Sequence, residues 1–304
     1  MNEIFDHRQV GRAFSRAATH YDEAAALQRE VGARLAESLP YYEDKALGAR
    51  TPQLVLDVGC GTGHGTALLQ AQWPKAQVIG LDLAPGMARE AQRRVSTKRG
   101  LLDFSKKPQI VRADALSLPL REGSVDVLFS NLCLQWIEDL PAVFAGFRRV
   151  LKPDGLLLVS TFGDQTLMEL HEAFSQADDA PHVSPFVDIA RFGDALIAAG
   201  FRDPVLDRDV FRLSQPDLPT LMRELRTLGA TNAMRDRRRA LTGRARFARA
   251  AQAYEALRTE RGLPVTWDVI YAQAWGPKPG APIRMGGIDE VRVPVSQIPI
   301  RRRG

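Results

Sequence analysis

The residues best suited to chemistry lie in a glycine-rich turn that follows an acidic residue. Positions 54–65 read LVLDVGCGTGHG, so that Asp57 precedes glycines at every second position from 59 to 65. An aliphatic strand that enters such a turn and continues into a helix brings backbone N–H groups close to a bound ligand. Four glycines would be a heavy entropic cost for a turn without a ligand. We therefore predict that this turn binds a ligand.

The spacing of the glycines excludes two common phosphate sites. A dinucleotide fingerprint has the form G-x-G-x-x-G, but counting from Gly59 puts its third glycine at His64, and counting from Gly61 puts it at Thr66. A P-loop is excluded because no Gly-Lys-Ser or Gly-Lys-Thr follows the turn. The carboxylate of Asp57 would repel a phosphate, but it suits a cationic or amino-bearing ligand.

A second acid ends the next apolar run. Asp82 lies 23 residues after Gly59, near the spacing at which an acid meets ribose hydroxyls in nucleotide sites. An acid there could also cap a helix that begins at Pro85, and the two roles are compatible. The markers that follow along the chain are the sequences RADA at 112–115, DVLFSN at 126–131 and LKPDG at 151–155.

With these motifs the sequence resembles the class I S-adenosylmethionine-dependent methyltransferases. In that family the glycine turn cradles the methionine part of the cofactor, and the acid after the second strand meets the ribose. The resemblance also implies that Asp114 meets the adenine amino group, that Ala115 offers its backbone, and that Asn131 lies beside the methyl-transfer point. It implies S-adenosylmethionine as cofactor and a cofactor site made of Asp57, Gly59, Gly61, Gly63, Asp82, Leu83, Met87, Asp114, Ala115 and Asn131.

The elements that must position these residues alternate between apolar strands and amphipathic helices. Such alternation builds βαβ units and a parallel sheet that is buried on both faces. We therefore predict an α/β protein with a doubly wound, Rossmann-like sheet. The expected strands are 54–58, 78–83, 110–115, 125–130 and 156–162, and the expected helices between them are 64–73, 85–95 and 140–151.

Helical segments are expected on either side of this core. The Ala-rich stretch 10–39 has apolar residues at steps of three and four, which predicts one or two helices. After residue 162 the alternation weakens, with helices expected at 166–176 and 188–199, strands at 205–213 and 265–275, and two polar helices between those strands. We expect an N-terminal helical cap at 1–50, a methyltransferase domain at 51–275 with a helical lid inserted at about 164–262, and a Pro/Gly-rich basic tail at 276–304.

Four segments outside the core refine the resemblance. They read FSRAATHYD at 14–22, ELHEAF at 169–174, DDAPHVSPF at 178–186 and LRTLGATN at 225–232. Together they resemble the malonyl-acyl-carrier-protein O-methyltransferases that start pimelate-moiety assembly in biotin synthesis, which implies methylation of the free carboxylate of a malonyl thioester on acyl carrier protein. Another small-molecule methyltransferase, for example on a quinone precursor, and a non-methylating assembly factor or protein hydroxylase on the same fold stay open as alternatives.

The implied chemistry needs positioning more than proton transfer. A carboxylate with a pKa of about 4 is ionised at pH 7, so no general base is needed. The site must align the carboxylate with the methyl group and exclude water. The candidates for a contact to the carboxylate oxygen that does not attack are Arg16, His182 and Arg226, and Tyr21 is a candidate lid over the cofactor. His171 and Phe174 are expected to face the core.

The positive charge of the chain is concentrated in patches. Lys and Arg number 41 against 36 Asp and Glu, a net charge of +5, and seven arginines fall between Met234 and Arg249 against one acid. Three more arginines stand at 301–303, so the remaining chain is slightly acidic. The strand at 125–130 is not followed by the Asn/Asp-Pro-Pro-aromatic signature of enzymes that methylate base amines. We therefore expect no nucleic-acid partner, and a surface for acidic acyl carrier protein at Arg235, Arg237, Arg238 and Arg239.

The composition sets the remaining limits. Hydrophobic residues make up 45% and charged residues 25% of the 304, as in ordinary globular proteins. No run of 18 apolar residues and no signal-peptide pattern occur, so we expect no membrane partner and a cytoplasmic location. Cys60 and Cys133 are too few for a disulfide framework or a zinc site, and Cys133 is expected to be a small buried hydrophobic residue rather than a nucleophile. No metal is expected.

Overall fold

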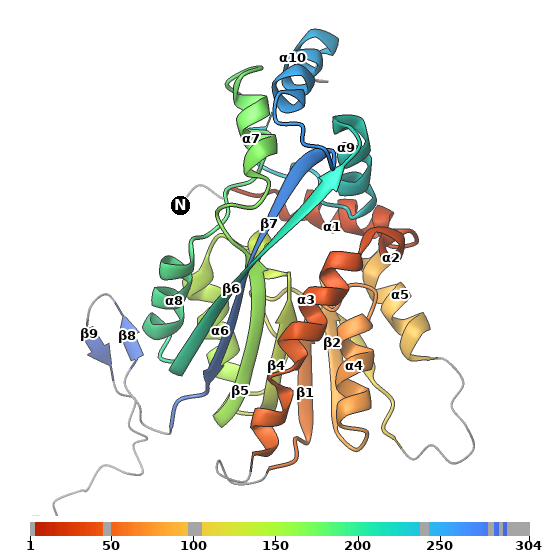
Figure 1. Cartoon of the computed structure of the whole chain (residues 1–304). Coiled ribbons are helices and arrows are strands. Elements are labelled where there is room, and N and C mark those ends of the chain that lie inside the picture. The colour runs from red at the N-terminus through yellow and green to blue at the C-terminus, as the bar shows by residue number, and fades with distance from the viewer. Residues whose placement is uncertain are drawn as a thin grey trace, which may run out of the picture.

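The fold is a single seven-stranded sheet with helices on both faces (Figure 1). The computed structural model describes residues 4–44, 50–96, 105–237 and 243–278 and the backbone of two short strands at 283–285 and 288–290. The strand order is β3-β2-β1-β4-β5-β7-β6, in which the first five strands pair in parallel and β7 and β6 pair antiparallel. The strands are β1 Leu54–Val58, β2 Gln77–Asp82, β3 Gln109–Arg112, β4 Val125–Asn131, β5 Leu151–Phe162, β6 Arg202–Gln215 and β7 Leu263–Trp275.

This order confirms the predicted doubly wound α/β class. The chain leaves β1 towards β2 and β3, then crosses back to β4 on the other side of β1. Ligands of such sheets bind outside the carboxyl ends of the strands, at the point where the winding reverses. The glycine turn after β1 and the end of β4 both lie at that point, so the sheet itself brings distant motifs together.

The two faces of the sheet are covered by different helices. On one face α3, η1 and α4 pack against Val55, Val78 and Leu158, and on the other α6 and α8 pack against Leu56, Leu128 and Leu157. The strands read as continuous apolar runs because both of their faces are buried. The helices of the core are η1 Leu39–Glu43, α4 His64–Gln72, α5 Pro85–Val95, η3 Leu134–Trp136, α6 Leu140–Val150 and α8 Ile189–Ala198.

The N-terminal cap divides into helices with different roles. The stretch expected to hold one or two helices forms three, α1 His7–Ala17, α2 Tyr21–Ala24 and α3 Ala26–Ala36. The α3 helix covers the sheet through buried Val31 and Leu35. The α1 helix instead lies beyond the carboxyl edge of the strands, next to α5, and its Phe14 contacts Gly229 at the end of α9 (Figure 1). Only α1 and α2 therefore cap the edge where ligands bind.

The segment 164–262, expected as a lid, also contributes to the core. Its helix α8 buries Phe192 and Leu196 on the sheet, and β6 is the edge strand paired along β7. The helices that stand beyond the carboxyl edge are α7 Met168–Ser175, α9 Leu218–Thr227 and α10 Arg244–Glu255 (Figure 1). They share one apolar cluster with the far ends of β5 and β7.

The C-terminal segment contains a short hairpin. Two antiparallel strands, β8 Ile283–Met285 and β9 Ile288–Glu290, pair within the segment that was expected to be a Pro/Gly-rich basic tail. Residues 291–304, with the arginines at 301–303, lie outside the described part of the chain. Within the described residues no helix is long and apolar enough to cross a membrane.

Candidate active site

The glycine turn after β1 adopts a conformation that side chains would disrupt. Gly59, Gly61 and Gly63 all have positive φ, between +54° and +85°. A Cβ on Gly59 would lie 2.4 Å from the Cys133 sulfur, and one on Gly63 would lie 3.0 Å from the Ala91 backbone. A Cβ on Gly61 would meet no atom within 4 Å, so the turn leaves open space above this residue. The turn packs tightly on the protein at two glycines and presents the third to a cavity.

Asp82 fixes the shape of this turn. One of its carboxylate oxygens accepts a hydrogen bond from the Gly61 N–H at 2.9 Å, and the other accepts one from the Ala84 N–H at 2.8 Å. Burial raises the pKa of Asp82 to about 6 although both backbone N–H groups favour the ionised form. Each oxygen keeps a further lone pair, which leaves acceptors for ligand hydroxyls.

Asp57 lies beneath the turn and is 2% exposed. The Thr66 hydroxyl donates a hydrogen bond to its carboxylate at 2.6 Å. Burial, together with the charge of Asp82, raises the pKa of Asp57 to about 7. Two neighbouring acids held in a low-dielectric site favour a cationic ligand, because a cation would lower the cost of ionising both.

The predicted cofactor residues surround two adjoining hollows. The first, of about 110 Å³, is lined by apolar side chains of α1, by Met87 of α5 and by predicted residues near the strand ends, namely Gly59, Gly61, Asp82, Leu83, Asp114, Ala115 and Asn131. The second, of about 320 Å³, lies over α4 and is lined by Asp57, Gly59, Gly61 and Asn131, together with Gln28 and Arg29 of α3. Gly63 lines neither hollow and is instead the N-cap residue of α4.

Tyr21 lies between the two hollows and lines both. Burial raises the pKa of its phenol well above the usual value, so the side chain is neutral. Asp22, the next residue, accepts hydrogen bonds from the Thr62 hydroxyl at 2.7 Å and from the Arg94 guanidinium. These contacts bind α2 to the glycine turn and to α5, and they fix the position of Tyr21 between the two hollows.

Asn131 ties the end of β4 to its neighbours. Its amide N–H₂ donates to the Gln28 carbonyl of α3 at 2.9 Å, and its amide oxygen accepts from the Ser160 hydroxyl of β5 at 2.8 Å. A Cβ on Gly32 would lie only 3.0 Å from the Asn131 amide nitrogen. Both polar groups of the Asn131 side chain are therefore hydrogen-bonded within the protein, and the side chain lines the two hollows in a fixed orientation. Gln28, Arg29 and the α1 residues Val10 and Phe14 were not predicted, because the sequence does not show which helix covers the strand ends.

A larger cavity, of about 510 Å³, is lined by residues of α7 and α9 and shares Trp136 with the first hollow. Its wall is apolar over most of its extent, with Phe162, Phe174 and Trp267 among the lining residues. The charged or titratable side chains that line it are His182, Arg226 and Arg237, and none of the described lining residues carries a carboxylate. The cavity is thus suited to a substrate with an anionic group and an apolar or amide-bearing chain.

The four predicted positioning residues are not all in this cavity. His182 and Arg226 line it, with Arg226 exposed at its rim. Arg16 is exposed and lines a separate hollow of about 560 Å³ between α1, α2 and α9, which also contains Arg226. Tyr21 instead lines the two smaller hollows. His171, expected to face the core, is exposed on α7, whereas Phe174 is buried as expected.

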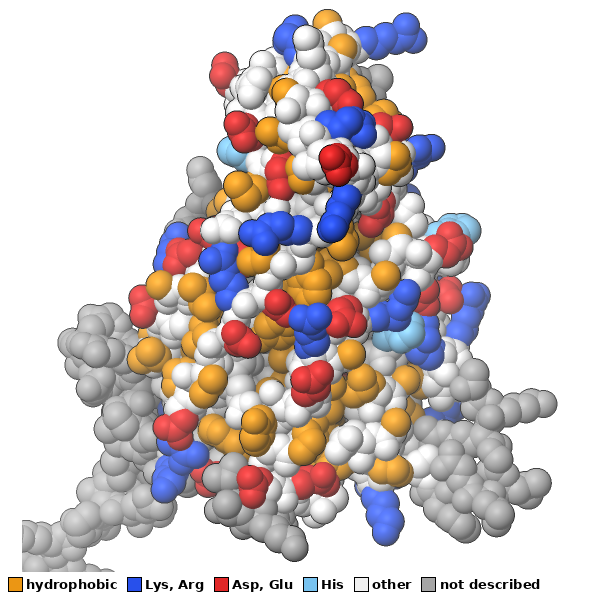
Figure 2. Space-filling model, viewed as in Figure 1, with side chains coloured by type: hydrophobic (Ala, Val, Ile, Leu, Met, Phe, Trp, Pro, Cys, Tyr) orange, Lys and Arg blue, Asp and Glu red, His pale blue; other side chains and the backbone are white. Residues whose placement is uncertain are grey.

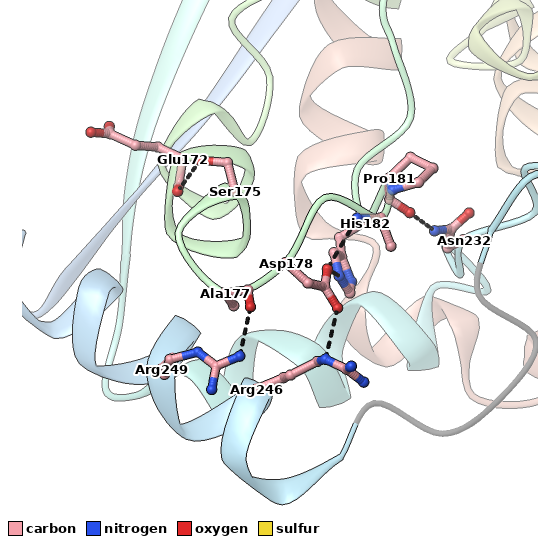
Figure 3. Close-up of polar contacts among 10 residues, drawn as sticks. Glu172, Ser175, Ala177, Asp178, Pro181, His182, Asn232, Arg246 and Arg249 are labelled. Atoms are coloured by element: carbon pink, nitrogen blue, oxygen red, sulfur yellow. Dashed lines mark hydrogen bonds and ion pairs between the residues drawn. The ribbon is translucent and has the colours of Figure 1, made fainter.

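The loop that carries His182 is bound to α10 (Figure 3). The His182 ring stacks on Phe174 with ring centroids 4.3 Å apart, and its Nε2 lies 2.7 Å from the carboxylate of Asp178. Arg246 of α10 lies 3.5 Å from the other oxygen of that carboxylate, and Arg249 donates to the Ala177 carbonyl at 2.8 Å. The charge of Asp178 is therefore shared between His182 and Arg246, and the arginines of α10 hold the loop beside the cavity.

The arginines predicted to bind a partner have different surroundings. Arg235 is exposed and its Nε lies 3.4 Å from the Phe5 carbonyl. Arg237 is half-buried, lines the large cavity and donates to Gln9 and to the Met234 carbonyl. Arg238 and Arg239 lie outside the described residues. The basic segment is therefore partly a wall of the cavity rather than only an outer surface.

Comparison with known proteins identifies relatives over the whole chain. Residues 56–159 match the family described as a methyltransferase domain. The chain is 52% identical over 304 residues to a malonyl-acyl-carrier-protein O-methyltransferase from Xylella fastidiosa, covering 100% of this chain and 99% of that relative. It is 40% identical over 272 residues to a bifunctional biotin biosynthesis protein from Saccharophagus degradans, covering 87% of this chain and 46% of that relative.

A solved structure agrees with the fold. The YcgJ protein from Bacillus subtilis superimposes with a TM-score of 0.53 at 17% identity, over 77% of this chain and 96% of that one. At this identity the likeness concerns the fold alone.

Proposed function

The chain belongs to the malonyl-acyl-carrier-protein O-methyltransferase family, and we propose that it methylates the free carboxylate of a malonyl thioester held by an acyl carrier protein. It is an S-adenosylmethionine-dependent methyltransferase of biotin synthesis. The methyl ester that it forms would prime the assembly of the pimeloyl moiety. A new O–CH₃ bond replaces the S–CH₃ bond of the cofactor, and no proton changes place.

The observation that carries this proposal is the composition of the large cavity. It offers His182, Arg226 and Arg237 to a ligand, and no carboxylate among its described lining residues opposes an anion. It meets the first cofactor hollow at Trp136. An anionic group bound in this cavity near Trp136 would therefore lie next to the end of the cofactor site.

The cofactor hollows have the chemistry that S-adenosylmethionine requires. Gly61 faces open space, Asp82 keeps free lone pairs, and the paired acids Asp57 and Asp82 favour positive charge. When bound, the cofactor supplies an activated methyl group on a positively charged sulfur. In this proposal Asp82 binds the ribose, Asp114 and Ala115 border the adenine, and Tyr21 covers the junction between the two hollows.

The protein's part in the reaction is to align and to exclude water. A malonyl carboxylate is ionised at pH 7, so the site needs no base. The apolar wall, which includes Phe162, Leu170 and Trp267, keeps water from the reacting groups. Methyl transfer from a cationic sulfur to an anionic oxygen removes both charges, and a dry site favours this change over the separated ions.

Acyl carrier proteins are acidic, and exposed arginines near the cavity would attract one. Arg16 and Arg226 share a hollow at the cavity rim, and Arg235 and Arg244 are exposed on the neighbouring basic segment. Basic side chains also stand at the outer end of the lid in Figure 2. Complementary charge of this kind speeds association with a carrier.

The free thiols of Cys60 and Cys133 are in keeping with a reducing, cytoplasmic setting.

The proposal is tested by the intact mass of the carrier. The enzyme is incubated with S-adenosylmethionine and malonyl-carrier protein, and we expect the mass of the carrier to rise by one methyl group. Acetyl-carrier protein, which lacks the free carboxylate, is the control and should gain nothing. An enzyme that binds the cofactor but leaves malonyl-carrier protein unmethylated would refute the proposed function.

A further inference from the structure

We propose that Arg237 binds the carboxylate of the substrate and that Gln9 positions Arg237 for this contact. This assignment rests on the proposed function and names the specificity residue of its acyl site. Three side chains of the cavity could bind an anion, namely His182, Arg226 and Arg237. They differ in whether a carboxylate of the protein lies beside them.

The surroundings of Arg237 hold it firmly and leave its charge uncompensated. Its guanidinium donates to the amide oxygen of Gln9 and, at 2.5 Å, to the Met234 carbonyl. Both acceptors are neutral, and among the described residues no carboxylate pairs with it. A guanidinium has five N–H donors, so three stay available to a ligand after these two contacts. A half-buried cation held in this way attracts an anion from the cavity that it lines.

The two other cations of the cavity are placed differently. His182 is paired with Asp178, whose carboxylate also meets Arg246 (Figure 3). Arg226 is exposed at the rim and faces the outer hollow as well. Arg226 would therefore meet a ligand at the entrance of the cavity, and the charge of Asp178 already lies next to His182. Arg237 is the half-buried cation of the cavity wall that has no carboxylate beside it among the described residues.

Gln9 is held in one orientation. Its N–H₂ donates to the Asn232 carbonyl at 3.0 Å while its oxygen accepts from Arg237. Because a carbonyl can only accept and a guanidinium can only donate, the Gln9 amide cannot flip without losing both contacts. The neutral Gln9 thus fixes the guanidinium without neutralising it.

The α1 helix connects this arginine to the cofactor side. Gln9 lies on α1, and the adjacent α1 residues Val10 and Phe14 line the first cofactor hollow. Phe14 packs edge-on against Trp136, with ring centroids 5.4 Å apart, and Trp136 lines both the hollow and the large cavity. A carboxylate on Arg237 would therefore be bound at the side of the cavity that α1 shares with the cofactor.

The expected kinetic effect follows from the change of charge during the reaction. Arg237 would bind the carboxylate oxygen that does not attack, and the negative charge on the carboxylate falls as the ester forms. The contact therefore stabilises bound substrate at least as much as the transition state. Its loss should raise KM, with a smaller effect on kcat.

The test compares wild type with Arg237→Gln and Gln9→Glu. The substrate is malonyl-pantetheine, which has no carrier surface, and the competitive inhibitor is acetyl-pantetheine, which has no carboxylate. For R237Q we expect KM for malonyl-pantetheine to rise on the order of 10- to 100-fold, the loss typical of a charged hydrogen bond, while the acetyl-pantetheine inhibition constant changes by less than about threefold. In Q9E the added carboxylate would neutralise the charge of Arg237, and we expect KM for malonyl-pantetheine to rise. If Arg237 had only a structural role, the new carboxylate would still hold it in place and KM would not change.

Arg191→Gln, on the exposed side of α8 away from both cavities, is the matched loss of one charge and should leave KM unchanged. Cofactor affinity and the unfolding temperature report on folding, and Q9E retains Arg237 should R237Q fold poorly. An unchanged KM in R237Q and Q9E, or equal losses for malonyl- and acetyl-pantetheine, would overturn the assignment while the proposed function stands. A wild-type enzyme that methylates no malonyl thioester would overturn both.

Discussion

Asp57, which is buried, and Asp82, which is half-buried at the edge of a hollow, both have pKa values raised towards neutral pH. Burial raises the pKa of Asp57 to about 7 and that of Asp82 to about 6, and the charge of Asp82 adds to the shift of Asp57. A cationic ligand binds the ionised form of such a pair better than the protonated form. Binding of the cation therefore strengthens as the pH rises through these pKa values and weakens as it falls through them.

We therefore predict that the affinity for S-adenosylmethionine falls by about 10-fold or more between pH 8 and pH 5.5. In Asp57→Asn the part of the transition near pH 7 should disappear while the part near pH 6 remains. The dissociation constant is measured by calorimetry across this range. S-adenosylhomocysteine, whose sulfur is neutral, serves as the control ligand and should show a smaller change.

An affinity that does not change with pH, or an equal change for both ligands, would contradict this role of the acids.

The stability of the Asp57→Asn variant should not complicate the comparison. The pKa of Asp57 is higher in the folded than in the unfolded chain, so the folded state keeps a proton that the unfolded state has lost. The free energy of unfolding therefore falls as the pH rises from about 4 to about 7. Asp57→Asn removes that cost, and its oxygen can still accept the hydrogen bond of Thr66. We expect no loss of folding at pH 8.

At the scale of elements, the cap depends on a close contact between α1 and α5. Gly86 in the first turn of α5 lies against the backbone of Ser15, and a Cβ there would come within 2.4 Å of the Ser15 carbonyl oxygen. The Gly86 N–H also donates to the Ser15 hydroxyl at 3.2 Å. Because the clash would be with backbone, α1 as a whole must move to admit a side chain.

Gly86→Ala should therefore displace α1 and weaken cofactor binding, since Val10 and Phe14 of α1 line the cofactor hollow. We expect a loss of about 1–3 kcal/mol in the free energy of unfolding, as for other overpacked sites, and at least about tenfold weaker cofactor binding. Denaturant unfolding and calorimetry measure the two effects. Gly146→Ala on α6, where the nearest atom to the new Cβ is 4.0 Å away, is the matched control and should be neutral or slightly stabilising. Equal behaviour of the two variants would show that the α1–α5 contact is not limiting.

At the scale of the whole molecule, positive charge is collected where the chain would meet a carrier. The net charge is +5, and the arginine-rich segment 234–249 contributes more than that on its own. Parts of this segment are committed within the protein, because Arg237 lines the cavity and Arg246 and Arg249 hold the loop of His182. The exposed arginines Arg235 and Arg244, together with Arg16, would attract an acidic carrier at long range.

We predict that KM for malonyl-carrier protein rises several-fold between about 0.03 M and about 0.3 M salt, because screening shortens the range of surface charges. KM for malonyl-pantetheine should change much less over the same range. Charge reversal at Arg16 and Arg244 should reproduce the effect of salt for the carrier substrate alone. Initial rates with the two substrates provide the measurement. Equal salt dependence for both substrates would exclude electrostatic docking.

The core of the fold was predictable from the sequence, and so was the part of the two smaller hollows that lies at the ends of the parallel strands. Asp57, the glycines and Asp82 belong to strand–turn–helix units in which position along the chain decides position in space. Parallel strands also end at a common edge, so local motifs far apart in sequence had to meet there. The edge strand β6 and the face-covering α3 and α8 were assigned to lid or cap, because their helical or strand pattern does not tell which surface they cover.

The sequence by itself determined a doubly wound sheet with a glycine turn after its first strand and acids in its first two strands. Only the tertiary structure decided that Arg237 lines the large cavity together with the predicted Arg226. Arg237 lies in a basic segment that reads as a docking surface, and its partner Gln9 is 228 residues away. The direction of a charged side chain depends on the neighbours that bury or pair it, and those neighbours come from elements that only the folded chain brings together.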